Sequence, residues 1–176
     1  MTCIVGVSQG GRVCIGGDSA GVAGYALDVR ADVKVFRNAD YVMGFTTSFR
    51  MGQLLHHTFK PPTPPTTRLE RFMVRDFIPA VMDCLETGGW LTSKNDRREG
   101  GTFLVGVRGE LFGIWDDFQV GSSRDGYLAV GCGESYAIGS LHSTKGREPR
   151  ARVKAALEAA AHHSGGVTGP FVIKTN

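Results

Sequence analysis

The chain opens with Met1-Thr2-Cys3-Ile4-Val5-Gly6-Val7, in which a small hydroxyl residue directly precedes a β-branched, apolar run. Removal of the methionine would make Thr2 the amino terminus, so that one residue carries a hydroxyl nucleophile and a free α-amine as its base. The ordinary pKa of an α-amine is about 7.7–8.0, so a small downward shift leaves it largely uncharged near neutral pH. Taken alone, Thr2 is better explained as a small second residue, and other positions must decide.

Two charged residues, Asp18 and Lys34, follow the first expected strand at positions where a charge needs an explanation. Residues 3–7 and 12–16 are apolar runs separated by the turn signal Gln9-Gly10-Gly11, which predicts a hairpin. Its second strand runs into Gly16-Gly17-Asp18, where glycines let the backbone turn and place the carboxylate at the sheet edge. Lys34 lies inside a short apolar run at residues 33–36, although lysine is disfavoured within strands and rarely buried unless paired.

Thr2, Asp18 and Lys34 together form a chemically sensible set. An ammonium group beside a terminal threonine lowers the pKa of its amine and polarises its hydroxyl, and a carboxylate beside the lysine orients it. Each residue alone has an ordinary explanation as a second residue, a turn aspartate or an edge lysine. The combination favours a nucleophile, an activator and an orienting group.

Length and composition restrict the class of protein. The 176 residues, 41% hydrophobic and 21% charged, predict one globular domain spanning 1–176. A net charge of +3 with scattered basic residues argues against nucleic acid as a partner. The four cysteines are widely spaced without a CxxC pair, so no metal site or disulfide framework is expected. The sequence offers no long apolar segment or leader, so we expect a cytoplasmic location without membrane contact.

The rest of the chain predicts an alternation of strands and helix pairs. Strands are expected at residues 41–46, 102–107, 110–115, 118–120, 127–130 and 171–173; helices are expected at residues 49–59, 66–85, 135–141 and 150–162; loops are expected at residues 20–25 and 88–101. Pro79 is expected to kink the second helix. Antiparallel sheets packed together, with the helix pairs outside, would bury every apolar face. The fold class is therefore α+β.

The sequence resembles the proteasome β-subunit and HslV peptidase family, the N-terminal-threonine branch of the Ntn hydrolases, and is most similar to HslV. The segments that carry the resemblance are Thr2-Cys3-Ile4-Val5, Gly17-Asp18-Ser19, Val33-Lys34-Val35, Gly44-Phe45 with Thr46-Thr47-Ser48, and 129–137 (Ala-Val-Gly-Cys-Gly-Glu-Ser-Tyr-Ala). As in HslV, a methionine alone precedes the threonine. The resemblance implies a four-layer αββα sandwich of two antiparallel sheets flanked by helix pairs.

The resemblance also implies roles for individual residues. Thr2 would attack the carbonyl carbon of a peptide bond, Lys34 would activate it, Asp18 would orient Lys34, and the Thr47 amide would help to hold the oxyanion. Cys132 occupies the position of a serine that organises the threonine amine. The substrate would bind along the backbone of Ala20, Gly21 and Val22 by strand addition, opposite Thr46 and Thr47. No cofactor and no metal is implied.

Several positions depart from the family pattern. Thr47 replaces a glycine, Cys132 replaces a serine, and Val22 stands where a hydroxyl residue is usual. Ser164 matches the serine of a late Asp-x-x-Ser element, whose aspartate position is held by Ala161, with His162 and His163 as neighbours. A thiol is a weaker hydrogen-bonding group than a hydroxyl, so the network around the amine is expected to be looser.

The sequence therefore predicts a threonine endopeptidase that acts through Thr2 after removal of Met1, in a homo-oligomeric ring. Its substrate would be a peptide or unfolded protein, and the resemblance makes an ATPase unfoldase a candidate partner. Two alternatives remain open. One is a non-proteolytic Ntn amidohydrolase acting on a small amide, and the other is a structural ring subunit with a weakened site.

Overall fold

Two antiparallel sheets stack face to face in the computed structural model, which describes residues 1–94 and 97–176. One sheet has the strand order β12-β1-β2-β13, and the other has the order β11-β10-β9-β6-β5. The strands are β1 (Cys3–Gln9), β2 (Arg12–Gly17), β3 (Ala20–Ala23), β4 (Ala26–Val29), β5 (Val35–Asn38), β6 (Tyr41–Phe45), β7 (Thr92–Lys94), β8 (Arg97–Glu99), β9 (Phe103–Val107), β10 (Glu110–Ile114), β11 (Val120–Gly121), β12 (Tyr127–Gly131) and β13 (Val172–Thr175).

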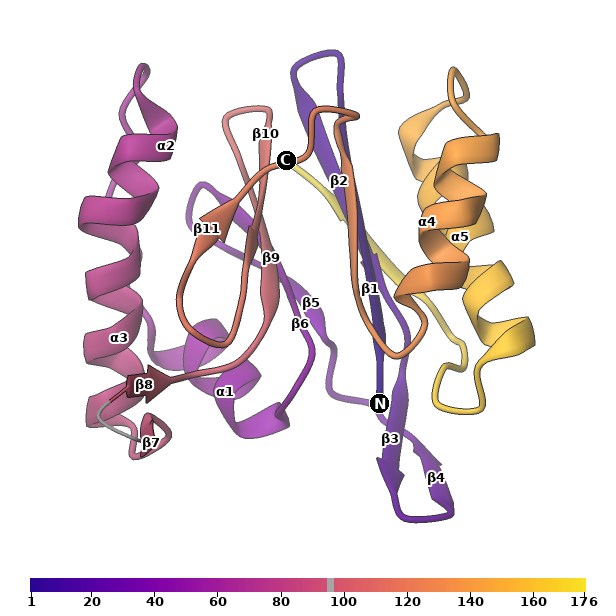
Figure 1. Cartoon of the computed structure of the whole chain (residues 1–176), viewed down its shortest axis with the longest axis horizontal. Helices are drawn as coiled ribbons and strands as arrows, with labels where there is room; N and C mark the ends of the chain where they lie inside the picture. The colour runs from indigo at the N-terminus through magenta and orange to yellow at the C-terminus, as the bar shows by residue number, and fades with distance from the viewer. Residues whose placement is uncertain (95–96) are drawn as a thin grey trace.

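Helices cover the outer face of each sheet, which gives four layers (Figure 1). The α-helices are α1 (Phe49–Gln53), α2 (Leu69–Phe72), α3 (Ile78–Thr87), α4 (Glu134–Ser143) and α5 (Pro149–His163), and the π-helical segments are η1 (Leu54–Thr58) and η2 (Met73–Phe77). The segments from α1 to α3 lie on the five-stranded sheet, whereas α4 and α5 lie on the four-stranded one (Figure 1). The α+β sandwich expected from the sequence is confirmed.

Three hydrophobic clusters correspond to the three contacts between these layers. The inner cluster joins the two sheets through side chains such as Ile4, Ile15 and Val35. The sheets approach closely because glycine occupies key positions: a Cβ atom built on Gly44 would lie 2.7 Å from the Ile4 side chain. Close packing of this kind excludes water from the region between the sheets, where the N-terminal strand runs.

The first hairpin sets the position of the chain's amino end. Its strands pair in the antiparallel register Ile4↔Gly17, and β1 also pairs with β12 in the register Cys3↔Gly131. β1 is therefore an interior strand with hydrogen bonds on both edges. Because β12 pairs with β1 from its first residue, Cys3, and β2 pairs with it from Ile4, Thr2 is held at a fixed point at the end of the sheet.

The structure differs from the sequence-based expectations at several places. The expected loop at 20–25 is instead half of a projecting hairpin, β3 with β4, because the small residues pair in the register Ala20↔Val29. Lys34 lies just before β5 rather than inside a strand, so its side chain turns inward without disrupting a ladder. The expected loop at 88–101 contains the strands β7 and β8, and its residues 95 and 96 lie outside the described residues.

The two expected helices on the five-stranded sheet are each divided. The helix at 49–59 continues from α1 into η1, and the helix at 66–85 runs through α2, η2 and α3. Pro79 stands in the first turn of α3, directly after η2, which agrees with a perturbed hydrogen-bonding pattern before a residue without an N–H group. Over the described ranges, none of the helices is long and apolar enough to cross a bilayer.

Candidate active site

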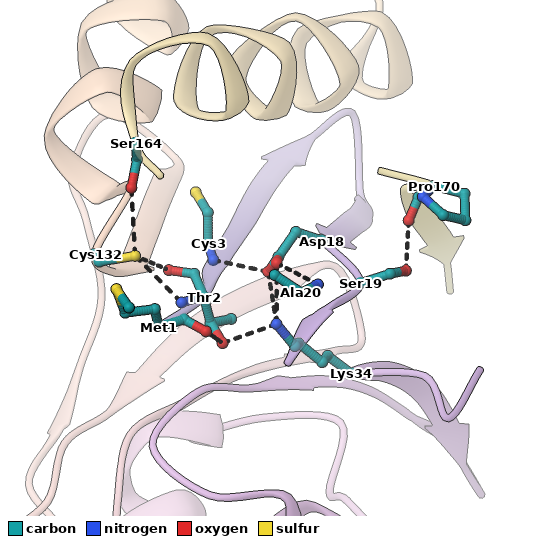
Figure 2. A network of polar contacts seen from close by, with 10 residues as sticks. All are labelled: Met1, Thr2, Cys3, Asp18, Ser19, Ala20, Lys34, Cys132, Ser164 and Pro170. Atoms are coloured by element: carbon teal, nitrogen blue, oxygen red, sulfur yellow. Dashed lines mark hydrogen bonds and ion pairs between the residues drawn. The ribbon is translucent and has the colours of Figure 1, made fainter. Parts of the chain in front are cut away.

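Thr2 lies at the start of β1, between the two sheets, and only 5% of its surface is exposed. Its Oγ1 accepts a hydrogen bond from the Lys34 ammonium, with 2.9 Å between Nζ and Oγ1. The same hydroxyl donates to the Met1 carbonyl oxygen, so Met1 occupies the space directly in front of the nucleophile. Figure 2 shows these side chains converging on one point.

Asp18 and Lys34 form a buried ion pair beside this hydroxyl. The ammonium contacts both carboxylate oxygens at 3.0 Å, and the side chains are 1% and 0% exposed for Lys34 and Asp18, respectively. Two backbone amides also donate to the carboxylate, from Cys3 at 2.9 Å and from Ala20 at 2.8 Å. Asp18 is thus held by β1, by its own turn and by the lysine, which fixes the direction of Lys34 toward Thr2.

Burial changes the acidity of the lysine. Desolvation lowers the pKa of Lys34 below its ordinary value of 10.5, because an ammonium group between the sheets has lost its water. The charge and the hydrogen bonds of Asp18 act in the opposite direction and raise the pKa. Two opposing influences therefore act on the pKa of Lys34, namely burial between the sheets and the paired carboxylate of Asp18.

A small cavity opens in front of Thr2. It has a volume of about 90 Å³, and its walls include Val22, Lys34, Phe45, Thr47 and Phe49. Thr47 adopts a left-handed backbone conformation with φ of 68°. This conformation is unusual for a β-branched residue and costs about 1–2 kcal/mol, so something must hold the residue in it.

The side chain of Thr47 supplies part of that restraint. Its Oγ1 accepts a hydrogen bond of 3.1 Å from the amide of Thr102, while the neighbouring Thr46 amide donates to the Thr102 carbonyl at 3.0 Å. Within the described part of the chain, the Thr47 amide donates no hydrogen bond. A left-handed residue with an unused N–H at the wall of a cavity has the geometry of an oxyanion donor.

Cys132 contacts the backbone of Thr2 on the side opposite Lys34 (Figure 2). Its Sγ accepts a hydrogen bond from the Thr2 nitrogen at 3.3 Å and donates to the Thr2 carbonyl at 3.4 Å. Ser164 Oγ lies 3.5 Å from the same sulfur. The Thr2 nitrogen is the atom that removal of Met1 would convert into an α-amine, so the thiol and the serine stand where such an amine needs partners.

The structure thus brings together residues that are far apart in the sequence. Lys34 contacts the Thr2 hydroxyl, and Asp18 contacts Lys34. Thr47 lines the cavity in front of Thr2, while Cys132 contacts the Thr2 backbone and Ser164 contacts the Cys132 thiol. Among the expected substrate-binding positions, Val22, Thr46 and Thr47 line the cavity, and Ala20 and Gly21 precede Val22 on the same strand. In contrast, His163 stacks on Tyr136 and His162 packs edge-on against His163.

The sequence-based analysis missed two residues next to the cavity. Phe49 forms one of its walls, and the Arg30 guanidinium lies 4.1 Å from the centre of the Phe49 ring. Phe45, which belongs to the segment Gly44-Phe45 that carries the family resemblance, forms another wall. The apolar character of Phe49 predicts only a core position on a helix, because its role as a wall depends on the reversal of direction between β6 and α1, which the local pattern does not show.

Comparisons with solved structures show which other proteins share this fold. The fold matches that of BPH from Thiobacillus denitrificans, solved alone and in complex with Epoxomicin, with 18% sequence identity, a TM-score of 0.79 and coverage of 99% of this chain and 97% of that one. It also matches eukaryotic HslV from Trypanosoma brucei, with 20% identity, a TM-score of 0.71 and 98% coverage of both chains. No family model matches the sequence, and no curated protein matches it.

The matches extend over nearly the full length of each chain, and the strand order and the helical layers are included in them. At 18–20% identity, these matches establish similarity of the fold alone. They therefore confirm the fold that the sequence resemblance implied. The chain therefore has the HslV-type fold, as its first strands and their charged neighbours predicted.

Proposed function

We propose that this protein is a threonine peptidase whose nucleophile is the hydroxyl of Thr2 after removal of Met1. The observation that carries the proposal is the 2.9 Å contact between Lys34 Nζ and Thr2 Oγ1, inside an ion pair that is almost completely buried. A positive charge at hydrogen-bonding distance stabilises developing negative charge on the oxygen, and this effect is strongest where water is excluded.

The reaction needs one proton acceptor, which the free α-amine of Thr2 would supply. The hydroxyl oxygen attacks the carbonyl carbon of the substrate while its proton passes to the amine. The resulting ammonium group gives that proton to the leaving nitrogen as the carbon–nitrogen bond breaks, and an ester on Thr2 remains. Water then attacks the ester, passes a proton through the same amine, and releases the acid and the free hydroxyl.

Two further groups would assist this cycle. The unused amide of Thr47 would donate to the oxyanion, and one such donor is typically worth about 2.7–4 kcal/mol in the transition state. Cys132 and Ser164 would orient the amine, since the sulfur already accepts a hydrogen bond from the Thr2 nitrogen at 3.3 Å. The edge of β3 would bind the substrate backbone as an added strand.

A homo-oligomeric ring is the assembly that we propose for this peptidase. Large apolar side chains are exposed on the projecting hairpin, at Tyr25, Leu27 and Val29, and on α4, at Tyr136 and Ile138. Contiguous exposed apolar surface is costly for a monomer and is typical of protein interfaces. Analytical ultracentrifugation would test this part separately: a sedimenting species of monomer mass at micromolar concentration would contradict it.

The nucleophile is tested by intact-protein mass spectrometry after treatment with a peptide epoxyketone. Such a probe offers one electrophilic carbon to a hydroxyl and a second to a free amine, so it reports on both halves of the proposed residue. BPH, one of the proteins with this fold, is known in complex with Epoxomicin, which makes this class of probe a reasonable choice.

We expect a protein that lacks Met1 and gains one probe molecule on Thr2. The Thr2→Ser variant should keep the adduct because it keeps the hydroxyl, Thr2→Ala should lose it, and Lys34→Ala should form it much more slowly. Retention of Met1 in the purified protein, or an adduct that persists in Thr2→Ala, would refute the proposal. An adduct without cleavage of any peptide would instead favour hydrolysis of a small amide.

A further inference from the structure

A second cavity adjoins the one in front of Thr2. It has a volume of about 260 Å³, and its walls include Asp32, Phe45, Gln53, His56 and His57. Phe45 is a wall of both cavities, so it lies between the space beside the nucleophile and the larger second cavity. A side chain next to a carbonyl bound at Thr2 would meet this boundary first.

One ion pair connects the two cavities. Arg30 and Asp32 form two hydrogen bonds, with distances of 2.6 Å from Nε to Oδ1 and 2.8 Å from Nη2 to Oδ2. Asp32 lines the second cavity, while the Arg30 guanidinium covers the ring of Phe49, which lines the first. Both side chains of the pair are 39% exposed, so either can meet a group that arrives from solvent.

The walls of the two cavities also carry Lys34 and two imidazoles, those of His56 and His57. Lys34 is paired with Asp18 in the buried contact described above. Burial, followed by the neighbouring His57, lowers the pKa of His56 below the ordinary value of 6.5, so this imidazole is neutral at pH 7 and above. The Arg30–Asp32 pair places a carboxylate at the second cavity and a guanidinium beside the first, and the two charges cancel while both partners remain.

We propose that the Arg30–Asp32 pair determines charge selectivity at this site, so that the intact pair favours substrates with an uncharged side chain on the acyl side of the cleaved bond. The inference rests on the proposed peptidase function. A charged side chain would have to compete with an existing partner for Asp32 or Arg30, whereas an uncharged one would enter without separating the pair. Substitution of either partner would leave the other charge unpaired and would change which substrate side chain is preferred.

The two halves of the pair give opposite predictions. Asp32→Asn leaves Arg30 without its carboxylate and should favour an acidic side chain, whereas Arg30→Met leaves Asp32 free and should favour a basic one. We expect each single variant to change the ratio of kcat/KM for glutamate and lysine substrates by about fivefold to tenfold, since a partly exposed charge interacts with modest strength. The double variant should return to the uncharged preference.

The test compares three peptide substrates that differ only in the acyl-side residue, which is glutamine, glutamate or lysine. The assay is run at pH 8, at low and at 1 M salt, on the full chain and on the three variants. Salt at 1 M reduces the Debye length to about 3 Å, so the altered preferences should shrink. Glu86→Gln provides the matched control, because it breaks an exposed pair of similar type, Arg98–Glu86 at 2.9 Å, on a different part of the surface.

The possible failures are distinguishable. If the epoxyketone probe does not modify Thr2, the proposed function fails and this inference fails with it. If Thr2 is modified and peptides are cleaved, but all proteins rank the three substrates in the same order, the inference alone is refuted. A preference of Asp32→Asn for lysine, or an equal change in Glu86→Gln, would also overturn it.

Discussion

The buried carboxylate of Asp18 can be tested by a nearly isosteric change, Asp18→Asn. The native carboxylate receives four contacts, two from Lys34 at 3.0 Å and one each from the amides of Cys3 and Ala20. All of these partners are donors. An amide side chain can accept with its oxygen, but its NH₂ group must then face at least one of those donors, and it carries no charge to balance the ammonium.

The loss of stability in Asp18→Asn depends on how deeply the remaining partner, Lys34, is buried. Lys34 is 2% exposed, so the ammonium cannot regain water without a movement of the two sheets. Removing one member of a buried ion pair typically costs about 3–5 kcal/mol, because the remaining charge is uncompensated. For a chain of this size, that loss corresponds to a fall in Tm of about 10 °C.

The loss should depend on pH in a direction that the Lys34 pKa determines. In the native state this pKa lies below 10.5, so the folded protein binds the proton more weakly than the unfolded chain does. The cost of burying the charge is therefore complete below the folded-state pKa and disappears as pH rises toward 10.5. Without Asp18, which raises this pKa, the folded-state value falls further, so the variant should recover stability relative to the native protein as pH rises.

Urea unfolding of both proteins at pH 7 and pH 9.5, followed by circular dichroism, measures the difference. Glu86→Gln, which breaks an exposed ion pair, should cost at most about 1 kcal/mol at either pH. A loss below about 1 kcal/mol for Asp18→Asn, with no change between the two pH values, would show that Lys34 is neither buried nor charged as described.

Five substitutions and one pH profile test separate features. Thr47→Val should lower the free energy of unfolding by about 1 kcal/mol, because the hydrogen bond from the Thr102 amide is lost. Thr47→Gly should leave the free energy of unfolding nearly unchanged, because release of the left-handed backbone strain offsets the loss of that hydrogen bond. Chemical denaturation measures both. Gly52→Ala should destabilise by about 1–3 kcal/mol, since its Cβ would lie 2.1 Å from the Phe45 ring, whereas Gly139→Ala on open α4 should stabilise by up to about 1 kcal/mol. Cys132→Ser should keep the activity and make it resistant to iodoacetamide, and native activity that survives alkylation of Cys132 would contradict a role beside the Thr2 nitrogen. The alkaline limit of kcat/KM should lie below pH 10.5, because the reaction needs the Lys34 proton and the pKa of Lys34 is lowered; a rate that stays constant to pH 10.5 would contradict this requirement for a Lys34 proton with a lowered pKa.

The features that the sequence predicted best depend on neighbours close along the chain. The hairpin of β1 and β2 follows from two apolar runs and a glycine turn, and it brings Asp18 to Cys3 without any information from elsewhere. The prediction that Lys34 points into the site depended partly on the family resemblance, because the sequence alone was equally consistent with a lysine that points to solvent from an edge strand. Its 2.9 Å contact with Thr2 resolves this choice in favour of an inward direction.

The features that escaped prediction depend on contacts between distant segments. The pairing of Ala20 with Val29 needs a second short strand, Ala26–Val29, whose four exposed residues show no regular alternation of apolar and polar side chains. The contact of Ser164 with Cys132 needs α5 to end above the last residues of β12, and the length of α5 alone does not determine that. Likewise, Arg30 is an ordinary surface residue until α1 places the Phe49 ring beneath its guanidinium.

The distribution of unfavourable features supports a chemical role for the region around Thr2. A buried ion pair is not needed for stability, since apolar residues of similar volume often stabilise a protein equally well or better. The left-handed Thr47 adds a conformational cost, and a glycine would avoid it. Both features lie at the same cavity of about 90 Å³, which Lys34 and Thr47 line together with Thr2, and Lys34 contacts the Thr2 hydroxyl. Folding alone explains neither of them, whereas activation of a hydroxyl and stabilisation of an oxyanion would require a charge and a free amide in these two places.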